Sequence, residues 1–78
     1  MNNSELLAQE VARWIGKILQ REIDPSKLDA SLVEDYGAAS MDMVDIAETL
    51  ERKYNIVVPD AQIFNFRTLK DVLLRIQS

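Results

Sequence analysis

Residues 33–59 read VEDYGAASMDMVDIAETLERKYNIVVP, and this stretch decides the fold of the chain. Gly37 and two alanines end a loop. A helix is expected from Ser40 to Tyr54, because apolar residues recur there at intervals of three and four. Asn55 is the expected C-cap, since asparagine tolerates the left-handed backbone that ends helices. The Ile-Val-Val run that follows has no second β-rich run to pair with, so we expect extended chain up to the closing proline.

The rest of the chain divides into three further helices and one long connection. Residues 21–39 form a loop with enough apolar side chains to pack down across the helices, including a turn of helix around Ser26–Leu28. We therefore expect a single all-α domain over residues 1–78, a four-helix bundle with three main helices, one short helix and a long first loop. The remaining expected helices are Ser4–Gln20, Asp60–Phe64 and Thr68–Ile76, with Ser4 and Thr68 as N-caps.

The composition excludes several kinds of chemistry. The 78 residues contain no cysteine and no histidine. Disulfides, thiol nucleophiles and imidazole bases are therefore ruled out, and no metal site is expected. A serine hydrolase of the familiar kind lacks its base. Any reactive sulfur would have to arrive on a cofactor.

The charge distribution points to basic partners. The net charge is −4, but residues 29–60 alone hold eight acidic and two basic residues. Such a segment repels nucleic acid and anionic membrane and attracts basic protein surfaces. No apolar run approaches the roughly 20 residues that span a bilayer, and the first ten residues lack the pattern of a signal peptide. We expect a cytoplasmic monomer that binds neither nucleic acid nor membrane.

Two interpretations are open for Ser40. A serine near a helix start is commonly its N-cap. Alternatively, Gly37 and the small residues Ala38 and Ala39 leave an exposed hydroxyl at a helix N-terminus. Free backbone N–H groups and the helix dipole would stabilise a phosphodiester at that place. Ser40 is therefore either a cap or an acceptor of a modification.

The second helix carries acidic residues at every third position. They are Asp42, Asp45, Glu48 and Glu51, with Thr49 on the same polar side. Such a row is commonly a solvated surface. Like charges on neighbouring turns also repel each other, so an acidic face favours docking to a positive surface. Weak binding of divalent cations is a third interpretation, although no calcium-loop pattern is present.

The segment SLVEDYGAASMDMVDIAETLERKYNIVVPD resembles the acyl carrier proteins, which bear phosphopantetheine in fatty acid and polyketide synthesis. The family's Gly-x-Asp-Ser-Leu attachment motif stands here as Gly37-Ala38-Ala39-Ser40-Met41. The resemblance implies that Ser40 receives 4'-phosphopantetheine from coenzyme A and that the thiol of this arm holds an acyl group as a thioester. It also implies that the chain is a carrier and not an enzyme.

The resemblance further implies two sets of contact residues. The partners would be a phosphopantetheinyl transferase and acyl-processing synthases with basic patches. They would dock on Met41, Asp42, Val44, Asp45, Glu48 and Glu51. The acyl chain would lie among Met43, Ala47, Leu50, Ile63 and Leu73.

One position departs from the family pattern. Ala39 stands where the family has an aspartate that transferases recognise, and alanine has no side chain to cap the helix. Two hypotheses follow. The chain is either a carrier loaded at Ser40, or a carrier-like domain that stays unmodified and acts as an acidic interaction module.

Overall fold

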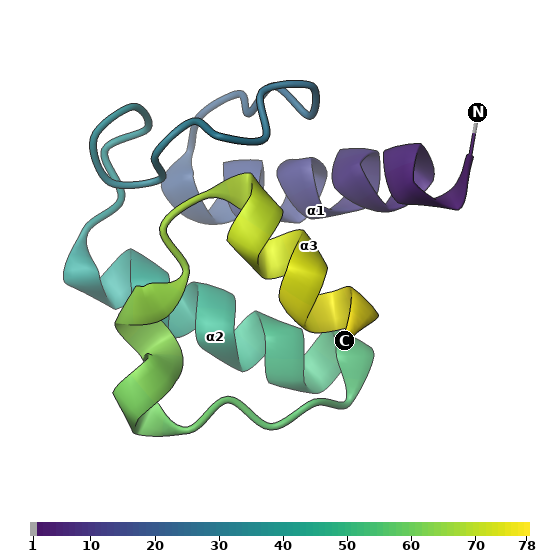
Figure 1. The fold of residues 1–78 in the computed structure, drawn as a ribbon. Helices are drawn as coiled ribbons and strands as arrows, with labels where there is room; N and C mark the ends of the chain where they lie inside the picture. The colour runs from purple at the N-terminus through teal and green to yellow at the C-terminus, as the bar shows by residue number, and fades with distance from the viewer. Residues whose placement is uncertain (1) are drawn as a thin grey trace.

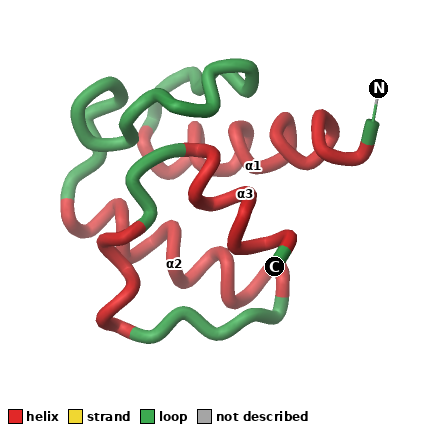
Figure 2. Tube along the Cα trace, viewed as in Figure 1, coloured by secondary structure: helices red, strands yellow, loops and turns green. Residues whose placement is uncertain are grey.

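A computed structural model describes residues 2–78 as a small helical bundle (Figures 1 and 2). Within these residues there is no strand, and one isolated bridge joins Ser31 to Thr68. The predicted all-α fold with three main helices, one short helix and a long first loop is confirmed. The elements are α1 (Asn3–Leu19), α2 (Ser40–Tyr54), the 3₁₀ helix η1 (Asp60–Asn65) and α3 (Leu69–Gln77).

The helices share one hydrophobic core. α1 packs against α2 and α3, and η1 packs against α2. Figure 1 shows α3 lying between α1 and α2, with residues 20–39 running along the outside of α1. The fully buried side chains come from every main helix and from the long loop. They include Val11, Ile15, Leu32, Ile46, Leu50, Leu69 and Val72.

The prediction of Ser4 as the first N-cap was wrong by two residues. Asn2 is the N-cap, and its Oδ1 accepts a hydrogen bond of 2.8 Å from the Glu5 N–H. Asparagine caps a helix as well as serine does, so the helix begins at Asn3, one residue before Ser4. Thr68 caps α3 as expected, and its hydroxyl and the Asp71 carboxylate form a reciprocal capping box.

The long loop is held at many points, as the sequence analysis expected. The Leu32 N–H donates to the Arg67 carbonyl at 2.9 Å, and the Lys70 N–H donates to the Leu28 carbonyl at 3.0 Å. The predicted turn of helix around Ser26–Leu28 is absent. The Asp24 carboxylate accepts from both the N–H and the hydroxyl of Ser26, which forms an Asx turn instead. These bonds also lower the pKa of Asp24.

Gly16 allows the chain to reverse closely after α1. Gln20 adopts the left-handed conformation, and the Arg21 N–H donates back to the Gly16 carbonyl at 3.0 Å. A Cβ on Gly16 would lie 2.7 Å from the Arg21 carbonyl oxygen. The close contact of this glycine is therefore with the chain reversal that follows its own helix.

A hydrogen-bonded chain of three side chains joins α1 to the end of α2. The Trp14 Nε1–H donates to the Tyr54 hydroxyl at 3.0 Å, and this hydroxyl donates to the Glu10 carboxylate. The two rings are tilted, with centroids 6.4 Å apart. Burial, reinforced by the bond to Glu10, raises the pKa of Tyr54 to about 12.

This pKa predicts how stability depends on alkaline pH. An unfolded tyrosine titrates near pH 10, so the folded state keeps the Tyr54 proton to higher pH. The contribution is therefore complete below about pH 10 and is lost as pH rises from 10 to 12. Tyr54→Phe should flatten the fall of the unfolding free energy over this range, measured by urea denaturation. An unchanged slope in the variant would contradict the assignment to Tyr54.

Candidate functional site

Hydrogen bonds hold the loop before α2 in a fixed geometry, and this loop sets the position of the first residue of the helix. The Ala38 N–H donates to the Leu32 carbonyl at 2.9 Å, and Ala38 is buried. The Gly37 N–H donates to the Val33 carbonyl at 3.0 Å. Gly37 has φ of 73°, a left-handed conformation that glycine adopts without strain. The loop therefore delivers the chain to Ser40 in one orientation.

Ser40 is the first residue of α2 and is exposed to solvent. Ala39 occupies the N-cap position with φ of −88° and ψ of 169°. The interpretation of Ser40 as the N-cap was therefore wrong, because the chain turns into the helix one residue earlier. Among the hydrogen bonds of residues 2–78 none involves the Ser40 hydroxyl, so this hydroxyl is free to react.

Asp42 fixes the start of α2 from inside its first turn. Its Oδ2 accepts the Ala39 N–H at 2.8 Å. This is one half of a capping box, and the other half is missing because Ala39 has no acceptor. The first bond of the helix runs from the Met43 N–H to the Ala39 carbonyl. The N–H groups of Ser40, Met41 and Asp42 thus surround the serine with the positive end of the helix dipole.

The four predicted acidic residues have different roles. The Glu51 carboxylate accepts the Val58 N–H at 3.0 Å, and so holds the extended segment between α2 and η1. Asp42 holds the helix start. Of these four residues, Asp45 and Glu48 are exposed, and their carboxylates make no hydrogen bond within the described part of the chain. The placement of Thr49 on this polar side was wrong, because its hydroxyl turns back to the Asp45 carbonyl and the residue is buried.

The structural role of Glu51 gives a testable expectation. Val58 is buried, so losing the acceptor of its N–H should cost about 1–2 kcal/mol of unfolding free energy. Glu51→Ala should show this loss in urea denaturation followed by the fluorescence of Trp14. Glu51→Gln keeps an acceptor oxygen and should retain most of the stability. Glu48→Ala, the matched surface control, should change it by less than about 0.5 kcal/mol. Equal losses in Glu51→Ala and Glu48→Ala would contradict this role.

Apolar residues on α2 fall into an outer and an inner group. Met41 is 69% exposed and Val44 is half-buried, so both flank the acidic residues at the surface. The residues expected to line an acyl cavity belong to one core cluster. Of these, Met43, Ala47, Leu50 and Leu73 are buried and Ile63 packs against them half-buried.

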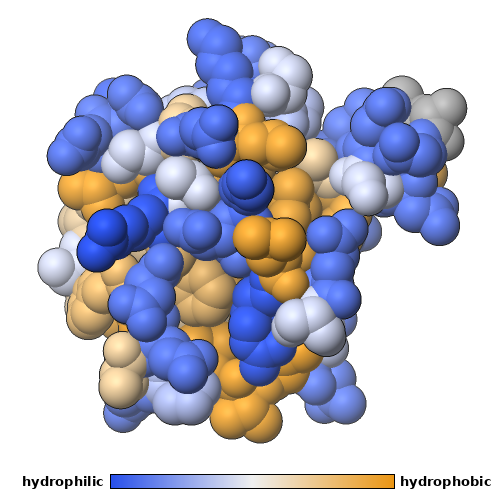
Figure 3. Space-filling model, viewed as in Figure 1, coloured by the Kyte–Doolittle hydropathy of each residue, from blue (hydrophilic) through white to orange (hydrophobic). Residues whose placement is uncertain are grey.

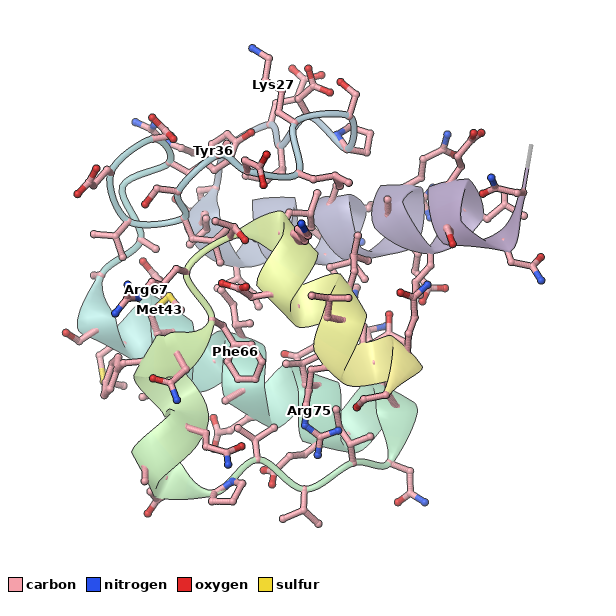
Figure 4. All side chains as sticks on the ribbon, in the orientation of Figure 1. Lys27, Tyr36, Met43, Phe66, Arg67 and Arg75 are labelled. Atoms are coloured by element: carbon pink, nitrogen blue, oxygen red, sulfur yellow. The ribbon has the colours of Figure 1, made fainter. Side chains whose placement is uncertain are left out.

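A surface cleft that no sequence pattern predicts lies beside the first turn of α2. We call it the Arg67 cleft, and its volume is about 330 Å³. Figure 4 shows the side chains of Met43 and Arg67 together at this end of α2. No linear sequence motif predicts the cleft, because residues from three separate segments of the chain line it. They contribute Ser31, Val33 and Glu34 from the loop, Met43 from α2, and Phe64, Phe66 and Arg67 from η1 and the link to α3.

The described residues form neither a metal site nor a membrane span. No group of three or more potential metal ligands occurs among them, and none of their helices is long and apolar enough to cross a bilayer.

Comparison with known proteins gives consistent matches over nearly the whole chain. The family model described as "Phosphopantetheine attachment site" matches residues 6–76. The chain is 36% identical over 70 residues to an acyl carrier protein of Campylobacter hominis, covering 90% of this chain and 89% of that protein. It is 35% identical over 75 residues to an acyl carrier protein of Thermosynechococcus vestitus, covering 94% and 89%. A meromycolate extension acyl carrier protein of Mycolicibacterium aurum is 34% identical over 73 residues, covering 88% and 75%.

Proposed function

Because this chain belongs to the acyl carrier protein family, we propose that Ser40 is the residue that carries its phosphopantetheine arm. The chain is an acyl carrier protein with covalent 4'-phosphopantetheine as its cofactor. The alternative of an unmodified acidic interaction module is not favoured by these matches. The free hydroxyl of Ser40 at the start of α2 is the observation that carries the assignment.

The chemistry of loading suits this position. The Ser40 oxygen forms a bond to phosphorus and loses its proton, while the phosphoanhydride bond of coenzyme A breaks and adenosine bisphosphate leaves. No side chain among residues 2–78 hydrogen-bonds to the Ser40 hydroxyl, so in this scheme the base that takes the proton belongs to the transferase. The new negative charge lies at the N-terminus of α2, where the free N–H groups stabilise it.

The arm supplies what the polypeptide lacks. The chain has no cysteine, so the thiol that holds an acyl group as a thioester comes with the arm. A tethered acyl group reaches successive enzymes at a high effective concentration. The chain itself catalyses nothing in this scheme. It works as a single carrier domain, monomeric and cytoplasmic, for synthases of fatty acids, polyketides or related products. The core around Leu50 and Leu73 shelters a purely alkyl acyl chain.

Loading can be tested directly. Incubation with coenzyme A and a phosphopantetheinyl transferase should raise the intact mass by one arm. Several transferases should be tried, because Ala39 replaces an aspartate of the family's attachment motif. No mass gain with any of them, and none after Ala39→Asp, would contradict the proposal.

The docking face should act through its two free carboxylates. Asp45 and Glu48 are exposed and their carboxylates have no hydrogen bond within residues 2–78, so basic patches can pair with them without disturbing the fold. The variant Asp45→Lys/Glu48→Lys should weaken binding to the transferase at low salt, by about tenfold or more, and the difference should shrink as salt rises. Calorimetric titration over a salt series measures it. Binding that is insensitive to both the substitutions and salt would count against acidic docking.

A further inference from the structure

The Arg67 cleft opens beside the attachment serine. Met43 forms part of its wall and follows Ser40 by three residues, so the two residues lie on the same side of α2. In Figure 4 the guanidinium of Arg67 points toward the beginning of α2, next to Met43. A group attached to Ser40 therefore starts about one helical turn from the cleft.

The backbone around the cleft is held in place before any ligand arrives. The Arg67 N–H donates to the Asp71 carboxylate at 2.9 Å, and the Arg67 carbonyl accepts from the Leu32 N–H at 2.9 Å. On the opposite rim the Glu34 N–H donates to the Ser31 hydroxyl at 3.0 Å. Little ordering is then needed on binding, which favours affinity.

The lining combines apolar surface with one cation. Met43 and Phe66 are buried and form the apolar floor, whereas Phe64 is 58% and Val33 53% exposed. Figure 3 shows apolar patches between polar side chains on the face of the molecule seen in Figure 1. Large apolar side chains exposed around a hollow commonly mark a binding site.

Arg67 is the cation of this cleft, and its side chain is exposed. The guanidinium makes no hydrogen bond within the described residues, while its backbone is fixed on both sides. A planar guanidinium binds the paired oxygens of a phosphate or a carboxylate. Glu34 lies on the same cleft, so it opposes an anion but can accept hydrogen bonds from amide or hydroxyl groups of a ligand.

We propose that the Arg67 cleft receives the group tethered to Ser40 and that Arg67 pairs with an anionic oxygen group on it. This inference rests on the proposed loading of Ser40. The phosphodiester next to the serine and a carboxylate at the far end of a carried acyl group share this chemistry. The amides and hydroxyl of the arm suit Glu34, and its methyl groups suit Phe64 and Val33.

Nuclear magnetic resonance of the unloaded and loaded proteins tests the proposal without any synthase. Loading should shift the side-chain Nε–H signal of Arg67 and the backbone signals of Glu34 and Phe64. Arg67→Gln should reduce the shifts at Glu34 and Phe64 and, where the phosphodiester is the partner of Arg67, should also move the phosphorus resonance of the loaded protein. Arg67→Lys, which keeps the charge but not the planar fork, should have a smaller effect. Arg52→Gln is the matched control, because it removes an exposed arginine near the other end of α2.

The possible results distinguish the phosphodiester from the carboxylate as the partner of Arg67. They also distinguish failure of the cleft proposal from failure of the proposed loading of Ser40. A shift of Arg67 in the loaded protein without an acyl group identifies the phosphodiester as its partner. A shift only with a carboxyl-terminated acyl group, and not with an alkyl one, identifies the carboxylate. If the mass shows loading but Arg67 stays unchanged in every form, the cleft proposal fails and the proposed function stands. If no mass is gained, both fail.

Discussion

Ser40→Ala should abolish the mass gain that coenzyme A and a phosphopantetheinyl transferase produce. The oxygen of Ser40 is the only atom of this residue that can form the ester, so no partial loading is expected. The hydroxyl makes no hydrogen bond among residues 2–78, and the residue is exposed in the first turn of α2. The unfolding free energy should therefore change by less than about 0.5 kcal/mol. Intact-mass spectrometry and thermal denaturation of the same sample measure both effects.

Ser4→Ala provides the matched control. Ser4 is also an exposed serine in the first turn of a helix, α1, and its loss should leave the mass gain intact. Loading that persists in Ser40→Ala would show that another residue accepts the arm. Loading lost in both variants would point to the transferase reaction and not to the serine.

Ala39→Asp should stabilise the fold and speed up loading. Ala39 already has the extended backbone of an N-cap, and the Asp42 carboxylate already accepts its N–H. An aspartate would add the missing acceptor for the first-turn N–H groups, which is worth about 0.5–2 kcal/mol. Repulsion from Asp42 places the expected gain toward the lower end. In a domain of this size, each 1 kcal/mol corresponds to about 4–8 °C in Tm.

Ala39→Asn separates capping from charge. Asparagine caps about as well as aspartate but adds no negative charge. Both variants should therefore raise Tm, while only Ala39→Asp should raise the loading rate if the transferase recognises charge before the serine. A gain in rate with both would assign the effect to the ordered helix start. Unchanged Tm in both would contradict the observed cap geometry.

The helices could be predicted because their signals are local. Apolar spacing and the left-handed Asn55 gave α2 its observed bounds, and Thr68 gave the start of α3. The first cap was missed because Asn2 and Ser4 are both good caps and only the folded chain decides between them. Residues 60–65 form a 3₁₀ helix one residue longer than expected, a distinction to which apolar spacing is insensitive.

The site could be predicted only in part. Ser40 and the exposed Asp45 and Glu48 follow from local pattern. The role of Glu51 depends on the path of the chain seven residues later, where the Val58 N–H turns toward it. The Arg67 cleft depends on three segments that meet only in the fold. Local pattern therefore predicted the proposed attachment point and the proposed docking face, while tertiary contacts decide which acidic side chains of α2 are left without a hydrogen bond in the described residues.

The central claim is that this chain carries its arm on Ser40 although Ala39 precedes it. The most direct measurement is peptide mass spectrometry of the protein purified from its own cells. The account predicts a phosphopantetheine modification, bare or acylated, localised to Ser40 on the tryptic peptide Leu28–Arg52, or Glu22–Arg52 when Lys27 is not cleaved. A protein recovered from those cells with Ser40 wholly unmodified would contradict it.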